Sequence, residues 1–224
     1  MKGYNLLADN KPSEIKIGDQ DLQKFRTPNA SAEAGTGYEK ITINGSNVTP
    51  EMGKIEIKNN NAGIAWGALY WQYFEKLDKI TSSNTGIRIT KQLFIQKNTD
   101  KGDVLTAINS TNTLNIGDLI KVRIEIYADR AMEYLHLKDM RSAGLEPTNV
   151  ISRYKYQDGL SYYESTKDAA TNFFINYMPK GTYVFEYPLR VTHSGNFSNG
   201  ITSLQNMYAP EFTTYSEGVR VNVK

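Results

Sequence analysis

The run Leu119–Tyr127 constrains the fold of this chain more than any other, because apolar and charged side chains alternate along it. A period of two residues is typical of a β-strand with one buried and one solvated face. Thr182–His193 is the longest further run with strand character. The two faces of the first run consist of Val122, Ile124 and Ile126 on one side, and Lys121, Arg123 and Glu125 on the other.

Many other short segments have the same character and are separated by turn residues. We predict strands at Ser13–Ile17, Tyr38–Ile43, Lys54–Lys58, Ile87–Gln96, Val104–Ile108, Met132–Leu137, Thr171–Tyr177 and Val219–Lys224, and a hairpin at Tyr154–Lys167 around Asp158-Gly159. Closely spaced strands and turns predict an all-β, immunoglobulin-like sandwich. The polar stretch Asp78–Gly86 is a candidate domain boundary, which predicts one domain at 1–80 and another at 81–224.

The segment Ile64–Phe74, IAWGALYWQYF, is apolar at both odd and even positions. This pattern predicts a strand that is buried on both faces, and a short helix is the alternative. We expect its aromatic side chains to fill a core or a seam between the two regions rather than to form an exposed ligand platform. Those side chains are Trp66, Tyr70, Trp71 and Tyr73.

Tyr183 follows a Met-Pro-Lys-Gly-Thr turn and stands near the start of a long predicted strand. This is the position of a tyrosine corner, in which the hydroxyl satisfies a backbone group of the preceding turn. We therefore predict that Thr171–Leu189 forms two adjacent antiparallel strands with Tyr183 at the corner. An ordinary half-buried tyrosine is the alternative.

Composition excludes several classes of function. With 224 residues, 39% of them hydrophobic, the chain is long enough for a packed core, and its net charge of +2 gives no drive toward nucleic acid. The absence of cysteine excludes disulfides, thiolate zinc sites and cysteine nucleophiles. No apolar run approaches a membrane span, and Met1–Ser13 has no apolar core of a signal peptide. Gly3–Asn10 resembles the tail of a helix, so we expect the chain to be cut from something longer.

Candidates for catalysis are few. His136 and His193 are the only histidines, and neither stands in a pattern that supplies a nucleophile, a base and an orienting acid. Two histidines without metal-ligand spacing also do not predict a zinc site. We expect His193 to cap a turn and His136 to be a structural residue, and we expect neither a cofactor nor a catalytic residue.

Acidic residues gather near one strand, and paired carboxylates are the groups that glycoside hydrolysis or calcium binding requires. Basic residues are interleaved with them, so we expect salt bridges at the rim of the sandwich instead. The residues are Asp129, Glu133 and Asp139, with Arg130, Lys138 and Arg141.

The run Met207–Phe212, MYAPEF, is a candidate interaction motif. Pro210 cannot donate a ladder hydrogen bond, and it biases the residue before it toward an extended conformation. Tyr208 and Phe212 flank it, and Glu211 adds a charge. Such a loop either tucks its aromatic side chains into the end of the sandwich or offers them to a partner, and we expect the tucked arrangement.

Three long segments carry a resemblance to a known family. They read GIAWGALYWQYFEKLDKI, LNIGDLIKVRIEIYADRAMEYLHLKDMRSAGLEP and YYESTKDAATNFFINYMPKGTYVFEYPLRVTHSGNFSNGITSLQNMYAPEF. From about Tyr38 onward the chain resembles the C-terminal end of bacterial alpha-2-macroglobulins, especially those of Bacteroides-type bacteria. The motifs MEYLHLKDMR and MYAPEF are the most specific part of this resemblance.

The resemblance implies a partial CUB-like β region at 1–80 and a C-terminal macroglobulin-like sandwich at 81–224. It implies a non-catalytic part of a periplasmic or cell-envelope protease trap whose parent is often lipid-anchored. The implied partners are other domains of the parent and, through the intact parent, target proteases, with no nucleic acid and no direct membrane contact.

Two departures from the family pattern matter. Without cysteine, the family's Cys-Gly-Glu-Gln thioester cannot reside in this chain, and Tyr215 stands where related chains often carry a histidine. The alternative functions are a cell-surface adhesin or carbohydrate-binding sandwich and, third, an accessory domain of a glycoside hydrolase.

Overall fold

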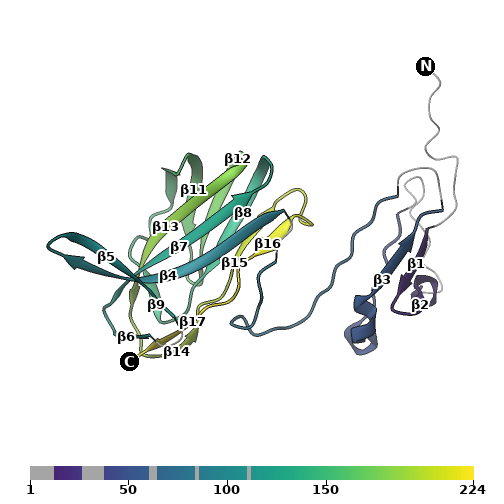
Figure 1. Ribbon diagram of the computed structural model, residues 1–224, viewed down its shortest axis with the longest axis horizontal. Helices are drawn as coiled ribbons and strands as arrows, with labels where there is room; N and C mark the ends of the chain where they lie inside the picture. The colour runs from purple at the N-terminus through teal and green to yellow at the C-terminus, as the bar shows by residue number, and fades with distance from the viewer. Residues whose placement is uncertain (1–12, 27–37, 61–64, 84–85, 110–111) are drawn as a thin grey trace, which may run out of the picture. The chain divides into compact units, whose positions relative to one another are not determined.

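A computed structural model describes residues 13–26, 38–60, 65–83, 86–109 and 112–224 (Figure 1). The chain forms two compact units, Met1–Tyr70 and Trp71–Lys224. Among the described residues there are strands and short 3-10 helices but no α-helix. The expected helix tail at Gly3–Asn10 lies outside the described residues.

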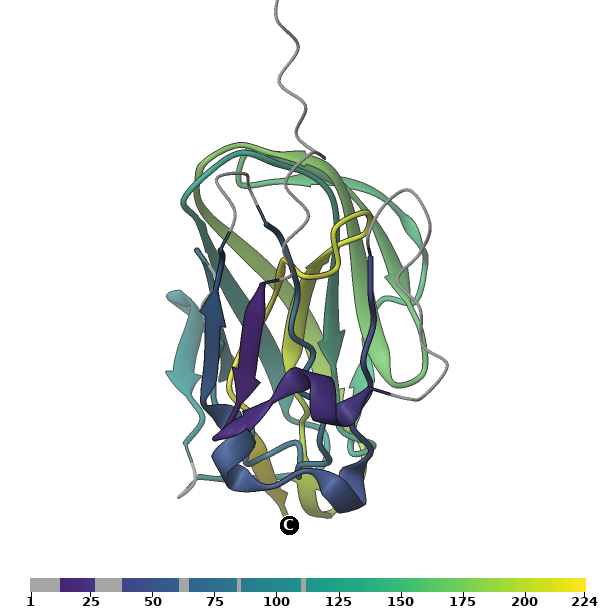
Figure 2. The ribbon, with the colours of Figure 1, turned by 90° about the vertical axis from the view of Figure 1, so that its right-hand side faces the viewer.

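The first unit holds a small antiparallel sheet with the strand order β2-β1-β3. Figure 2 shows the purple strand β1 beside the blue strand β3. Lys16 of β1 is opposite Glu56 of β3. Met52 is the only fully buried apolar side chain among the residues described in this unit, so its core is small. The bounds are β1 Glu14–Ile17, β2 Gln20–Asp21, β3 Ile55–Lys58, η1 Leu22–Phe25, η2 Gly45–Asn47 and η3 Pro50–Gly53.

Two of the strands expected in this region are present and one is not. β1 and β3 confirm the predictions at Ser13–Ile17 and Lys54–Lys58. The prediction at Tyr38–Ile43 is wrong, because no strand covers these residues. Alternation describes the faces of a strand, but a strand also needs a neighbour to satisfy its backbone hydrogen bonds.

The buried strand expected at Ile64–Phe74 is also absent. Ile64 lies outside the described residues, and 65–76 contain neither helix nor strand. Trp66 is 78% exposed and Phe74 is fully exposed, so these side chains do not fill a core within either unit, and the expected seam between the two regions stays a prediction. A strand buried on both faces needs partners on both edges, and no described strand pairs with this segment.

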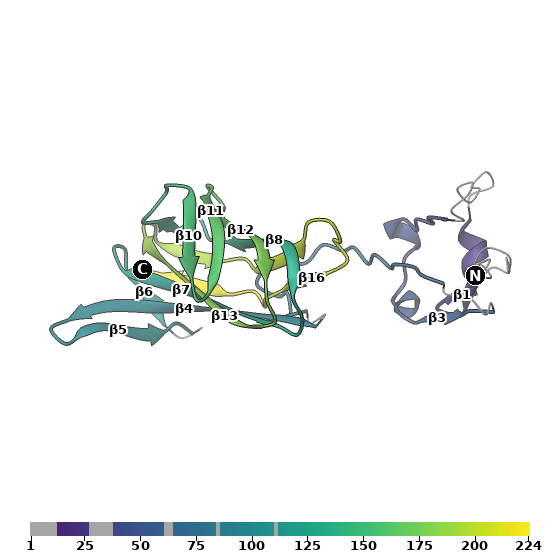
Figure 3. The same ribbon diagram turned by 90° about the horizontal axis from the view of Figure 1, so that it is seen from above.

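The second unit is a sandwich of two large sheets, which Figure 3 shows as separate layers. One sheet has the order β5-β4-β7-β13-β9 and the other β10-β11-β12-β8-β15-β16, with antiparallel pairs throughout. The strands of the first sheet are β4 Ile87–Thr99, β5 Gly102–Ala107, β7 Leu119–Ala128, β9 Leu145–Pro147 and β13 Gly181–Val191. Those of the second are β8 Met132–Met140, β10 Arg153–Gln157, β11 Leu160–Thr166, β12 Ala170–Met178, β15 Thr202–Asn206 and β16 Thr213–Tyr215.

A third, small sheet closes one end of the sandwich with the order β14-β17-β6. β17 is antiparallel to β14 and parallel to β6. Val221 of β17 is buried in the core, so the end of the chain contributes to the sandwich. The bounds are β6 Thr113–Leu114, β14 Gly195–Ser198 and β17 Arg220–Val223.

The core lies between the two large sheets. β7 buries every second side chain from Ile120 to Ile126, as the alternation predicts. Aromatic rings from both sheets meet near its centre, where the ring centroid of Phe173 on β12 lies 5.6 Å from that of Phe185 on β13. The expected all-β, immunoglobulin-like sandwich is confirmed.

The pairing expected between the two strands of Thr171–Leu189 is wrong. β12 pairs with β8 and β11, whereas β13 pairs with β7 and β9. The turn at Pro179 therefore carries the chain from one sheet to the other. β13 alternates throughout and β12 alternates from Thr171 to Ile175, and their buried faces pack across the sandwich instead of side by side.

Candidate interaction site at the end of the sandwich

The structure brings together two stretches that the sequence singles out, the start of β8 and the Met207–Phe212 loop between β15 and β16. The backbone N–H of Met207 donates to the carbonyl oxygen of Tyr134 at 2.9 Å. The side-chain amide of Asn206 donates to the carbonyl oxygen of Glu133 at 3.0 Å. The loop is thus fixed to the first residues of β8.

The loop also holds its own shape. The side-chain oxygen of Asn206 accepts hydrogen bonds from the backbone N–H groups of Tyr208 and Ala209, both at 2.9 Å. The N–H of Phe212 donates to the carbonyl oxygen of Ala209 at 2.9 Å, which closes a turn around Pro210. An asparagine that satisfies backbone groups two and three residues ahead is a common way to fix such a turn.

Tyr134 has a φ of +54°, which lies in the left-handed region that residues other than glycine rarely adopt. The alternation of β8 changes phase at this point. Met132 and Leu135 both face the core, and Tyr134 faces solvent. Strict alternation along β8 would place Met132 on the same face as Tyr134 and His136, and the change of phase prevents this. The Tyr134 ring meets the ring of Tyr208 edge to face, with centroids 5.1 Å apart.

The aromatic side chains of this region are exposed, which contradicts the expected tucked arrangement. Tyr208 is 78% exposed, and Pro210 and Glu211 are exposed as well. A recess of about 370 Å³ lies between the loop, the Arg130–Glu133 segment and Tyr177. We call the exposed apolar side chains around it the end patch, which consists of Tyr134, Tyr177, Met207, Tyr208 and Phe212.

Tyr183 has a separate, structural role. Its hydroxyl donates to the carbonyl oxygen of Pro179 at 2.9 Å, which is the hydrogen bond that a tyrosine corner requires. A Cβ atom on Gly181 would lie only 3.3 Å from this hydroxyl, so the corner leaves little room there. The hydrogen bond fixes the turn by which the chain passes from β12 to β13.

The histidines make local contacts only. His136 Nε2 lies 2.9 Å from Asn172 Oδ1, and its ring stacks on Phe174 with centroids 4.8 Å apart. His193 Nδ1 lies 2.9 Å from the hydroxyl of Thr192. Among the described residues, no group of three or more His, Cys, Asp or Glu side chains could hold a metal ion. Within the same residues, no helix is long and apolar enough to cross a membrane.

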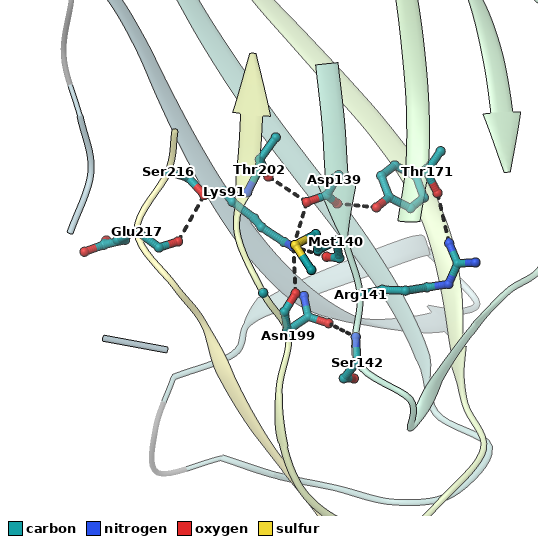
Figure 4. Close-up of polar contacts among 12 residues, drawn as sticks. Lys91, Asp139, Met140, Arg141, Ser142, Thr171, Asn199, Thr202, Ser216 and Glu217 are labelled. Carbon is teal, nitrogen blue, oxygen red and sulfur yellow. Dashed lines mark hydrogen bonds and ion pairs between the residues drawn. The ribbon is translucent and has the colours of Figure 1, made fainter. Parts of the chain in front are cut away.

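A buried polar network joins the two large sheets, and Figure 4 shows its members. The side chains of Lys91 on β4 and Asp139 on β8 are both 0% exposed, and Lys91 Nζ lies 2.7 Å from Asp139 Oδ1. The Lys91 ammonium also donates to the carbonyl oxygens of Met140 at 2.6 Å and Asn199 at 3.2 Å. Three acceptors match its three donors, which offsets the cost of burying the charge.

The Asp139 carboxylate is equally well supplied. Thr202 Oγ1 donates to Oδ1 at 2.6 Å, and the Tyr187 hydroxyl donates to Oδ2. Burial, followed by the negative charge of Asp139, raises the pKa of Tyr187 well above its ordinary value. The hydroxyl therefore remains a protonated donor. The ammonium has three acceptors, and the carboxylate accepts from three donors. We therefore interpret the pair as a structural link between the sheets, called the pin below, rather than as a catalytic pair.

The salt bridges expected at the rim are confirmed for Asp129 with Arg130, whereas the rim position is wrong for Asp139 and for Arg141. Asp129 and Arg130 form an ion pair of 2.8 Å between exposed side chains. Asp139 lies in the core, and Arg141 is buried and donates to Thr171 Oγ1 at 3.2 Å. The alternation along β4 could have revealed the buried lysine. Lys91 follows Ile87 and Ile89 at intervals of two residues, so it lies on the buried face of the strand.

Comparison with known proteins identifies the family. Residues 86–211 match the model of the bacterial alpha-2-macroglobulin MG10 domain, which is more than half of the chain. The chain belongs to the bacterial alpha-2-macroglobulin family. No curated protein matches this macroglobulin chain in sequence.

Solved structures of alpha-2-macroglobulins share the fold. The Salmonella protein carrying the mutation Y1175G is 19% identical, with a TM-score of 0.50, over 65% of this chain and 10% of that one. The Escherichia coli protein activated by porcine elastase is 15% identical, with a TM-score of 0.51, over 65% of this chain and 14% of that one. The macroglobulin chain thus spans a small part of the proteins that it resembles.

Proposed function

We propose that this chain is the C-terminal, non-catalytic part of a protease-trapping inhibitor, and that its end patch contacts another domain of the same parent protein. The match of residues 86–211 to the MG10 domain carries this proposal. The E. coli relatives are described as activated by trypsin and by elastase. We extend that behaviour to the parent of this chain.

The end patch is suited to a contact between domains. Exposed Tyr, Met and Phe side chains are enriched in protein interfaces, whose rims are polar. Arg130 and Glu133 line the same recess and supply a polar border. The loop is fixed by hydrogen bonds to β8 before any partner binds, so binding orders few additional groups and loses less entropy.

The remaining parts of the proposal follow from the family. The chain has no cysteine, so any thioester of the parent is located in another domain. The parent resides in the periplasm or the cell envelope, where it meets proteases. Residues 1–80 are a partial CUB-like region that precedes the macroglobulin domain. The chain acts through its contacts within the parent and catalyses no reaction of its own.

The first test measures binding of this chain to the remainder of its parent protein. Tyr208→Ala should weaken that binding about ten-fold or more, because truncation of a well-packed aromatic anchor costs about 2 kcal/mol. Tyr156→Ala is the matched control, since Tyr156 is 74% exposed but lies outside the end patch. Equal affinity of all three proteins would contradict the proposed contact.

The second test concerns protease trapping. The intact parent, incubated with trypsin, should leave the protease active toward a small peptide substrate but protected from a protein inhibitor. The 224-residue chain alone should neither protect trypsin nor hydrolyse ester or glycan substrates. Turnover by the chain alone that is abolished by a substitution at His193 or Glu133 would overturn the non-catalytic assignment.

A further inference from the structure

A row of aromatic side chains crosses the solvent-facing side of the six-stranded sheet. Tyr154 on β10 is opposite Tyr163 on β11, and Tyr163 is opposite Phe174 on β12. Phe174 is in turn opposite His136 on β8. Because these residues are cross-strand partners, their side chains emerge on one face at the spacing of neighbouring strands, about 4.8 Å.

The rings of this row are held in place before any ligand binds. Tyr154 and Tyr163 meet edge to face, with centroids 5.1 Å apart. Phe174 and His136 stack with an interplanar angle of 4°, and His136 is fixed by its contact with Asn172 at 2.9 Å. Packing of the two rings within each pair limits their rotation, so less side-chain entropy is lost on binding.

The row borders an open trough of about 470 Å³ over β10, β11 and β12. This volume lies within the range of roughly 300–1,000 Å³ found for small-molecule sites. None of the residues that line the trough carries a charge. The lining includes Tyr154, Ser161, Tyr163, Phe174, Asn176 and Tyr177, and the core residues Leu160 and Tyr162 also contribute to it.

Several polar groups in the trough have unused hydrogen-bonding capacity. Within the part of the chain that the structure describes, the side chains of Ser161, Asn176 and Tyr177 make no hydrogen bond to another residue. A hydroxyl and an amide offer both donors and acceptors. The trough thus combines aromatic faces with neutral donors and acceptors.

We propose that this trough binds a neutral oligosaccharide. Pyranose rings present C–H faces that pack on the negative faces of aromatic rings, and their hydroxyls need neutral donors and acceptors at the edges. The lack of charge disfavours phosphate groups and acidic or basic peptides. The trough lies on the face of the sheet and not along the free edge of β10, so it does not suit a peptide added as a further strand. The proposal does not rest on the proposed inhibitor function, although Tyr177 belongs to both the trough and the end patch.

The experiment titrates the whole chain with cellohexaose and chitohexaose by calorimetry, with a hexamer of galacturonate as the charged counterpart. At least one neutral hexamer should bind, and the charged hexamer should bind at least ten-fold more weakly. Tyr154→Ala and Asn176→Ala should each weaken binding three- to ten-fold, the range expected for one aromatic contact or one hydrogen bond.

Tyr156→Ala is the matched control, because Tyr156 is on the same strand and 74% exposed but does not line the trough. It should leave the affinity unchanged, and all three variants should keep the denaturant midpoint of the unmodified chain. The proposal is overturned if neither neutral hexamer binds at millimolar concentration, or if Tyr154→Ala and Tyr156→Ala have equal effects. Self-association of the chain that Tyr154→Ala abolishes would identify a protein occupant and overturn it as well.

Discussion

Single polar side chains hold this sandwich at two points, the corner at Tyr183 and the pin at Lys91. The corner joins the start of β13 to the turn just before it, whereas the pin joins strands of the two large sheets. At the corner one neutral hydrogen bond of 2.9 Å fixes a turn. At the pin a fully buried ion pair of 2.7 Å connects β4 with β8. Their loss should therefore differ in size.

Tyr183→Phe removes only the hydroxyl of the corner. Loss of one buried hydrogen bond should lower the free energy of unfolding by about 1 kcal/mol, and by up to about 3 kcal/mol if the carbonyl oxygen of Pro179 is left unsatisfied. Denaturant unfolding measures the change. Tyr154→Phe is the control, because Tyr154 is 78% exposed and should show no loss. An unchanged midpoint for Tyr183→Phe would mean that the hydrogen bond adds no stability.

Lys91→Met leaves the carboxylate of Asp139 buried without its counter-charge. Breaking one side of a buried pair should cost about 3–5 kcal/mol in the free energy of unfolding. The double variant Lys91→Met with Asp139→Asn removes both charges and retains an acceptor for Tyr187 and Thr202. It should recover part of the loss, and additive effects of the two substitutions would exclude coupling between these side chains.

Alkaline pH should destabilise the fold through its buried tyrosines. Burial raises the pKa of Tyr162 to about 12, and that of Tyr187 is raised well above its ordinary value. These hydroxyls are neutral when folded, whereas unfolded tyrosines ionise near pH 10. The stabilisation is therefore complete below about pH 10 and declines as the pH rises further, by at most about 1.4 kcal/mol per pH unit for each tyrosine.

Denaturant unfolding between pH 8 and 12 checks this dependence. The slope above pH 10 should be smaller in Tyr187→Phe than in the unmodified chain, even though the variant is less stable at pH 8. A variant with an exposed tyrosine replaced, Tyr156→Phe, should keep the original slope. Identical slopes in all three proteins would show that Tyr187 titrates alike in the folded and unfolded chain.

At the scale of elements, the sequence predicts most strands of the second unit but not their partners. Period-two patterns locate β7, β11, β12 and β13 because one face of each strand is buried. The same patterns cannot say which sheet a strand joins, so β12 and β13 were expected to pair. The sheet that a strand joins depends on whether the turn before it returns the chain to the same sheet or leads it to the opposite one, as the turn at Pro179 does.

The segment 77–83 should brace the end of the sandwich although it contains no strand. Ser83 donates its N–H to the carbonyl oxygen of Tyr215 at 3.0 Å, and Gly218 donates to Ile80 at the same distance. Asp78 also forms an ion pair of 3.1 Å with Arg220. A chain that begins at Trp71 should therefore unfold at a higher denaturant concentration than one that begins at Gly86. Equal midpoints would show that the segment adds no stability.

At the scale of the whole molecule, the sequence alone predicts the fold class and singles out the two stretches that supply the end patch apart from Tyr177. It does not predict that they meet, because the contact depends on the positive φ of Tyr134 and on hydrogen bonds from Asn206 and Met207. The expectation that Tyr208 and Phe212 would be tucked inward is wrong for a related reason. Hydrophobic residues in a loop follow no periodic pattern, so the sequence does not indicate whether their side chains point inward or outward.

The Lys91–Asp139 pair also has a mechanical consequence. If one sheet slid over the other by a single residue, about 3.3 Å along the strands, the two charges would have to separate inside the protein, away from water. Separation of such a pair costs several kcal/mol, which is a large fraction of the stability of a typical domain. The sandwich therefore resists shear. If a larger parent protein rearranged, the sandwich would rotate or translate as one rigid body. The shape of the end patch would then be preserved.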